Sequence, residues 1–295
     1  MCVASPKMVK FPVELILFIE KGAHMAYHPE NLLILANTYP TPSQKYRETN
    51  CVAAINETGE LRRLFPIPYR LLEGEDKFKK WEWISAKIQK ASNDHRPESY
   101  RIDIDNIQRN IGQIDTTDDW GKRIPYIRSH IVDDFSTLEQ RRISTGQTLG
   151  AIGPVKILKL EIVAEKDTEW SEEELTKLSQ DGLFDSEEVR KRQPLRKLPY
   201  RFYYHYEISF NNQVETNRHL ITDWEAGTLY WNCIKRYGLE WEKFFRLMLE
   251  DEFAKKDLVF LMGTVHRFPD QWLIVSMIYP PKGALQRPRQ KSLFD

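Results

Sequence analysis

The most regular hydrophobic pattern in the chain lies in residues 199–210, PYRFYYHYEISF, where bulky apolar side chains occupy every second position. Successive side chains of a strand point to opposite faces. One face would therefore carry Tyr200, Phe202, Tyr204, Tyr206, Ile208 and Phe210. The pattern predicts a strand with one apolar face.

Shorter apolar runs bounded by Gly, Pro or Asn predict further strands. They lie at residues 32–36, 51–55, 61–67, 81–88, 153–165, 257–265 and 271–279. Gly59 stands in the short connection between the second and third of these runs, which indicates a β-hairpin.

Helices are predicted where the apolar spacing changes. Ile104, Ile107 and Ile111 recur at helical spacing, and a second helix is expected over residues 129–142. Short strands with few helices between them favour β-barrels over a doubly wound sheet. The predicted fold class is therefore mainly β with some α (α+β).

Two helix starts are predicted from capping-box pairs, in which a hydroxyl residue stands three positions before a glutamate. One pair is Ser171 with Glu174, and the other is Thr222 with Glu225. Gly182 would end the first of these helices.

The charges balance, because 43 Lys and Arg residues face 43 Asp and Glu residues. A dominant field for nucleic acid is thus absent, and any basic surface must come from local segregation. An acidic stretch over residues 165–188 precedes a basic one over 190–201. We interpret the pair as a solvated helix and linker, the usual nature of charge runs.

Three widely spaced cysteines, Cys2, Cys51 and Cys233, do not suit a disulfide framework and favour a cytoplasmic location. No run of 18 apolar residues is present, so no membrane partner is expected. We expect residues 1–26 to be an N-terminal extension and residues 286–295 to be a flexible tail.

Basic and aromatic side chains alternate through the first β-rich segment. Aromatic rings stack on unpaired bases while Arg and Lys follow the phosphate backbone, so this set predicts nucleic-acid binding. Its members are Lys45, Tyr46, Arg47, Arg62, Arg63, Tyr69, Arg70, Lys80, Trp81, Trp83, Arg96, Tyr100 and Arg101, with Lys79 beside them. In the alternative interpretation, Trp81 or Trp83 is a core residue and the arginines form ion pairs.

A second candidate site is acidic. Glu98, Asp103 and Asp105 could hold Mg²⁺ for an enzyme acting on a nucleotide or nucleic acid, with a pocket near Tyr46, Arg47 and Glu48. Solvated loop carboxylates are the simpler interpretation.

Histidine and cysteine spacings match no zinc signature, and the phosphate-binding, dinucleotide-binding and nucleophile-elbow glycine motifs are absent. No metal, cofactor or catalytic residue is predicted.

Several sequence blocks resemble a known family, the dual OB-containing domains of predicted bacterial conflict and antiphage systems. The blocks are ILAN at 34–37, CVAAINETGELRRLFPI at 51–67, the strand at 81–88, RPES at 96–99, LITDWE at 220–225 and WLIVSMIYPP at 272–281. The resemblance spans most of residues 30–281, and the 103–150 insert departs from the family pattern.

This resemblance implies two OB-like barrels and a nucleic-acid or nucleotide-binding role, without assigning catalytic residues. We expect a first OB-like domain with a helical insert over residues 27–148 and a second with helices over 149–285. The predicted function is binding of single-stranded or structured DNA or RNA by an accessory or sensor protein of antiphage defence. The alternatives are the enzyme described above and a protein-interaction module that uses the Tyr-rich strand or the acidic helix.

Overall fold

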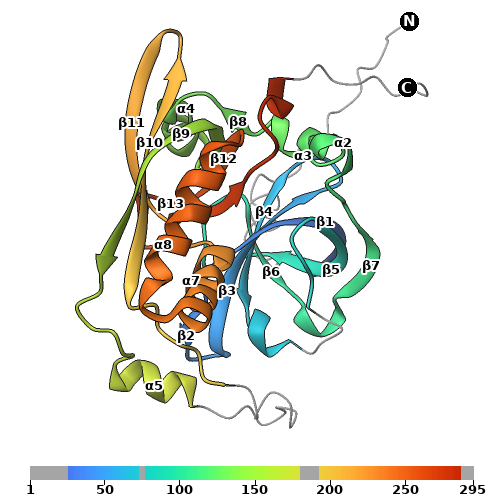
Figure 1. Ribbon diagram of the computed structural model, residues 1–295. Coiled ribbons are helices and arrows are strands. Elements are labelled where there is room, and N and C mark those ends of the chain that lie inside the picture. The colour runs from blue at the N-terminus through green and yellow to red at the C-terminus, as the bar shows by residue number, and fades with distance from the viewer. Residues whose placement is uncertain (1–25, 73–76, 180–192, 287–295) are drawn as a thin grey trace, which may run out of the picture.

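The structure is a computed structural model and describes residues 26–72, 77–179 and 193–286 (Figure 1). It is mainly β, with helices between and beside two sheets. The predicted fold class is confirmed. Among the described residues, no helix has both the length and the apolar character needed to cross a bilayer.

The first sheet closes into a five-stranded barrel. Its strands follow the order β1-β3-β4-β6-β5, and β5 pairs back onto β1. All these pairings are antiparallel except that of β4 with β6. The bounds are β1 His28–Asn37, β3 Arg47–Asn56, β4 Leu61–Ile67, β5 Glu82–Lys90 and β6 Ser99–Ile102. Two further strands, β2 (Thr41–Ser43) and β7 (Gln108–Gln113), pair with β3 and β5.

The second sheet has the strand order β11-β10-β9-β12-β13. The bounds are β9 Leu149–Ala164, β10 Tyr200–Phe210, β11 Gln213–Leu220, β12 Leu258–Val265 and β13 Phe268–Ile278. Its two ends meet at a parallel bridge between Ile221 and Ile274, so this sheet forms a half-closed barrel. Counted along the chain, both sheets place their third strand beside their fifth in parallel.

Helices cover the second barrel and connect the two sheets. Between β11 and β12 lie α7 (Trp224–Tyr237), η4 (Gly238–Glu240), α8 (Trp241–Arg246) and the π-helical turn η5 (Leu247–Glu252) (Figure 1). The connection from β9 to β10 contains α5 (Glu172–Leu178), which packs against β2 and β3 of the first barrel. The shorter helices are η1 (Tyr69–Leu71), η3 (Ile104–Asn106), α2 (Thr117–Trp120), α3 (Ile124–Arg128), α4 (Phe135–Thr145) and η6 (Ala284–Gln286).

Three apolar clusters hold the molecule together. Leu32 and Ile34 of β1 point into the first barrel, whereas Leu33 and Leu35 pack against the second barrel. This explains the unbroken apolar run at residues 32–36, because a strand buried on both faces needs no polar alternation. Each such buried side chain contributes roughly 1.5–3 kcal/mol relative to an exposed one.

The second barrel is filled by the predicted apolar face of β10. Phe202, Tyr204, Tyr206 and Ile208 are all buried, while the intervening side chains are more exposed. The period-two prediction is confirmed for these four residues, whereas Tyr200 is half-buried and Phe210, at the end of the strand, is exposed.

The helix predicted from Ile104, Ile107 and Ile111 is wrong. The chain instead forms the short turn η3, capped by Asp103, and then the strand β7. Ile107 is buried in the first barrel, and Gln108 pairs with Ser85 of β5. Pairing with a sheet edge outweighs the local helical spacing here, a tertiary effect that periodicity cannot show.

The capping box of Ser171 and Glu174 is confirmed at α5, and Gly182 lies outside the described residues. The predicted cap at Thr222 is wrong by one residue, since Asp223 caps α7. The Thr222 hydroxyl instead donates to the Ile274 carbonyl at 3.2 Å.

The second sheet begins earlier than the expected boundary at residue 149. The short strand β8 (Ile131–Val132) pairs in parallel with β9. Of the expected extension and tail, residues 1–25 and 287–295 lie outside the described ranges.

Candidate functional site

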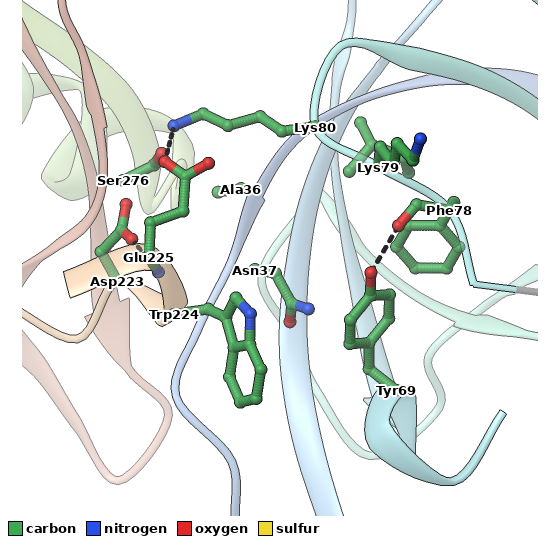
Figure 2. Close-up of a pocket in the computed structure, with 11 residues that line it drawn as sticks. Ala36, Asn37, Tyr69, Phe78, Lys79, Lys80, Asp223, Trp224, Glu225 and Ser276 are labelled. Atoms are coloured by element: carbon green, nitrogen blue, oxygen red, sulfur yellow. Dashed lines mark hydrogen bonds and ion pairs between the residues drawn. The ribbon is translucent and has the colours of Figure 1, made fainter. Parts of the chain in front are cut away.

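A pocket of about 230 Å³ lies where the two barrels meet (Figure 2). Its lining comes from both halves of the chain: the end of β1, the segments around η1 and before β5, the first turn of α7, and β13. The lining residues are Ile34, Ala36, Asn37, Tyr69, Phe78, Lys79, Lys80, Asp223, Trp224, Glu225 and Ser276.

Aromatic rings form one wall of the pocket. Trp224 stacks on Tyr39 with ring centroids 5.7 Å apart, and Tyr69 meets the Trp224 indole edge-on at 6.3 Å. The Tyr69 hydroxyl donates to the Phe78 carbonyl at 2.6 Å. Burial raises the pKa of Tyr39 and of Tyr69, so both hydroxyls stay protonated at neutral pH.

Tyr39 is itself held by the second barrel. Its hydroxyl donates to the Arg196 carbonyl at 2.8 Å and accepts from Trp231 Nε1 at 2.9 Å. The stack under Trp224 is therefore rigidly placed.

A charged group spans the seam between the barrels. Lys80 Nζ lies 2.9 Å from Glu225 Oε2 and donates to the Met277 carbonyl at 2.8 Å. Burial alone would lower the pKa of Lys80, but attraction to the Glu225 and Asp223 carboxylates outweighs it and raises this pKa. Lys80 is thus a cation at neutral pH, paired across the junction.

Asp223 ties the start of α7 to β13. Its Oδ1 accepts from the backbone N–H groups of Glu225 and Ala226, and its Oδ2 accepts from Met277 N at 3.1 Å. Burial raises the pKa of Asp223, against the lowering effect of Lys80.

Two polar atoms of the pocket residues lack partners. Asn37 Oδ1 and Ser276 Oγ are buried and form no hydrogen bond with any described residue. An unsatisfied buried polar atom costs about 1–3 kcal/mol. A bound water or ligand would remove this cost.

Of the predicted basic-aromatic set, Tyr69 and Lys80 line this pocket. Arg62 is buried instead, where it pairs with Glu30 at 2.9 Å and with Glu60 at 2.7 Å. Arg63 is buried between the barrels and donates to the Thr148 carbonyl at 3.0 Å. The interpretation of Arg62 and Arg63 as exposed phosphate contacts is corrected, because both guanidiniums serve internal pairs.

The two tryptophans do not form an open platform. Trp81 is buried in the cluster between the barrels, with its ring centroid 5.7 Å from that of Trp120. Trp83 is half-buried, with its ring edge-on to Tyr126 at 5.7 Å. The prediction that a base stacks on Trp81 is therefore corrected. Trp81 is a core residue, as the alternative interpretation proposed.

The loop that follows β2 lies beside the segment containing α5. Arg47 Nε donates to the Leu178 carbonyl at 3.3 Å, and Arg70 pairs with Glu48 at 2.8 Å. Lys45 is exposed and lies over the half-buried Tyr46 ring at 4.7 Å. This part of the predicted set is thus separate from the pocket lining.

The last members of the set belong to the β5–β6 end of the first barrel. Arg96 pairs with Asp94 at 2.6 Å and donates to the Thr264 carbonyl at 2.9 Å. Tyr100 lies beneath the guanidinium of Arg62 at 4.8 Å, and Arg101 donates to Asn93 at 3.3 Å. Each of these side chains has a partner within the chain, and the Arg101–Asn93 hydrogen bond is exposed.

The acidic candidate does not assemble. Asp103 accepts from the Asp105 and Asn106 N–H groups within its own turn, while Glu98 is buried and accepts from Thr148. The described residues contain no group of three or more His, Cys, Asp or Glu arranged to hold a metal ion.

Sequence reasoning from residue types missed Asn37, Asp223, Trp224, Glu225 and Ser276 as pocket residues. Available signals were the blocks ILAN, LITDWE and WLIVSMIYPP, which contain all five of them. These blocks are far apart along the chain and meet only in the folded structure.

Two family models match the chain, and the boundary between them lies close to the start of the second sheet at β8. Residues 28–129 match a domain of unknown function (DUF8758), and residues 132–295 match another domain of unknown function (DUF8757). The second match covers more than half of the chain, so the protein belongs to the DUF8757 family. No curated protein matches the sequence.

Proposed function

We propose that the protein binds single-stranded nucleic acid and takes one unpaired base into the pocket between the barrels. The observation that carries this proposal is the aromatic wall of Trp224 and Tyr69 beside the exposed Lys79 in that pocket. Aromatic rings stack on any base, and a lysine attracts the phosphates that flank it.

The strand order supports the same proposal. A five-stranded barrel that closes through a parallel pair of its third and fifth strands is the arrangement of the OB-fold, whose members often bind oligonucleotides. We therefore infer that both barrels are OB-like. In the first barrel, α5 packs against β2 and β3. We therefore propose that the nucleic acid binds at the junction between the two barrels.

The size of the pocket suits one base. Pockets for drug-sized ligands usually measure about 300–1,000 Å³, and this one is about 230 Å³. We propose that a single base enters while the rest of the strand remains on the surface near the exposed Lys79.

Fluorescence anisotropy with short DNA and RNA single strands tests the proposal. Trp224→Ala should weaken binding by about 1–3 kcal/mol, the usual contribution of one stacked base. Trp170→Ala provides the matched control, because Trp170 is half-buried in the segment before β10, outside the pocket lining. Circular dichroism should show that both variants are folded.

Affinity should also fall with rising salt, and the slope should be shallow because few phosphates are neutralised. Absence of binding at low salt, or equal affinities of the wild type and Trp224→Ala, would rule out the proposal. The resemblance to conflict-system proteins supports a role as an accessory or sensor in antiphage defence, and the cysteine pattern supports a cytoplasmic location.

A further inference from the structure

We propose that the pocket between the barrels selects a base with an exocyclic amino group, and that Asn37 is the residue that recognises this group. The inference rests on the proposed function, because it specifies the ligand of the same pocket.

The polar groups that line the pocket are rich in hydrogen-bond acceptors. Asn37 Oδ1 has no donor among the described residues. Glu225 accepts from Lys80, and its side chain remains 50% exposed. A carboxylate has more acceptor sites than one ammonium group fills, so Glu225 can accept a further hydrogen bond.

The buried charged groups of the pocket are already paired. Lys80 Nζ donates to Glu225 and to the Met277 carbonyl, at 2.9 and 2.8 Å. The Asp223 carboxylate accepts from backbone N–H groups of α7 and β13. Of the two unpartnered buried atoms, the Ser276 hydroxyl can donate or accept, whereas Asn37 Oδ1 can only accept. An entering base therefore meets one acceptor, Asn37 Oδ1, that needs a donor.

The bases differ in what they can supply. Cytosine and adenine present an amino group where uracil and hypoxanthine present a carbonyl oxygen. Asn pairs with the amino edge of adenine, and carboxylates accept from the amino group of cytosine. Rotation of the Asn37 amide could offer its NH₂ to a carbonyl, but the Glu225 carboxylate would still repel that oxygen.

The position of Asn37 suits this role. It ends β1, where its backbone pairs with Val52. Figure 2 shows its amide directed into the space between the Trp224 indole and the Tyr69 ring. A base stacked on Trp224 would therefore turn an edge toward Asn37.

The test compares single strands that differ only in this group: oligo(dC) with oligo(dU), and oligo(dA) with oligo(dI), which carries hypoxanthine. Fluorescence anisotropy should give roughly ten-fold tighter binding for the amino member of each pair. Asn37→Leu should reduce both ratios to about one. Asn232→Leu, on an exposed position of α7, should leave the ratios unchanged.

The outcomes separate the two proposals. Equal binding of the paired oligomers by the wild type overturns the base selectivity and leaves strand binding intact. A ratio that survives Asn37→Leu overturns the assignment to Asn37. Failure of every oligomer to bind overturns the proposed function together with this inference. The wild-type comparison holds even if Asn37→Leu does not fold.

Discussion

At the scale of single residues, the half-buried His219 of β11 shows how packing against the second barrel controls a charge. The Tyr206 hydroxyl forms a hydrogen bond of 2.9 Å with His219 Nδ1, and the Phe135 ring centroid lies 5.1 Å from that of the imidazole. Burial lowers the pKa of His219 to about 4. The ring is therefore neutral at physiological pH and accepts a proton only with a loss of stability.

The pH dependence of unfolding should report this residue. In the unfolded chain the pKa of His219 is about 6.5, so the unfolded state binds the proton more tightly than the folded state. Stability from this group is complete above about pH 6.5 and falls as the pH drops toward 4, by up to about 3 kcal/mol.

Urea unfolding at a series of pH values would measure this loss, with His219→Phe as the comparison. The His219→Phe variant should lack the loss of stability that protonation of His219 causes. Loss of stability from protonation of carboxylates should be the same in both proteins. Parallel pH profiles of the wild type and His219→Phe would contradict the assignment.

At the scale of elements, α7 positions the pocket because it packs closely against the first barrel. A Cβ atom on Gly227 would lie 2.3 Å from Cδ2 of Tyr39. Since Tyr39 stacks on Trp224, glycine at this position lets the helix approach the aromatic wall.

Gly227→Ala should therefore destabilise the protein, although alanine favours helices over glycine by about 1 kcal/mol. The displaced Tyr39 ring should cost about 1–3 kcal/mol, as overpacking does. Thermal unfolding and near-ultraviolet circular dichroism would record the change. Asn232→Ala, exposed on the same helix, should be neutral or slightly stabilising, and a similar loss there would show that the effect does not come from the contact with Tyr39.

Elements were predictable where local pattern and tertiary position agree. The alternation of β10 and the capping box of α5 belong to the chain locally, so the sequence indicates them correctly. The strand β7 and the cap at Asp223 depend on pairing with β5 and β13, and local spacing misplaced both.

At the scale of the whole molecule, the two barrels share an apolar interface and a buried polar bridge. Arg63 Nη2 donates to the Thr148 carbonyl and lies 3.6 Å from Glu98 Oε1. Thr148 N donates to the same Glu98 oxygen at 2.9 Å. Both charged side chains are only 4% exposed, so each depends on the other for compensation.

Arg63→Met should lower the free energy of unfolding by about 3–5 kcal/mol, because it leaves the Glu98 charge buried without its partner. Chemical denaturation would measure the loss. Adding Glu98→Gln should recover part of it, which separates the unpaired charge from lost packing. Arg101→Met, a half-buried control, should change stability by about 0.5 kcal/mol or less. An equally small effect for Arg63→Met would show that the bridge does not hold the junction.

The sequence by itself determined eight of the strands, the mainly β class and the presence of aromatic and basic residues in the first barrel, because periodicity and turn residues are local properties. Only the tertiary structure decided what those residues do. Packing of one barrel on the other buries Trp81 and Arg63 and brings Asn37 of β1 beside Trp224 of α7. Asn37 and Trp224 are nearly 190 positions apart and become neighbours because the two barrels bury apolar surface against each other. Local sequence patterns do not show which segments will pack together.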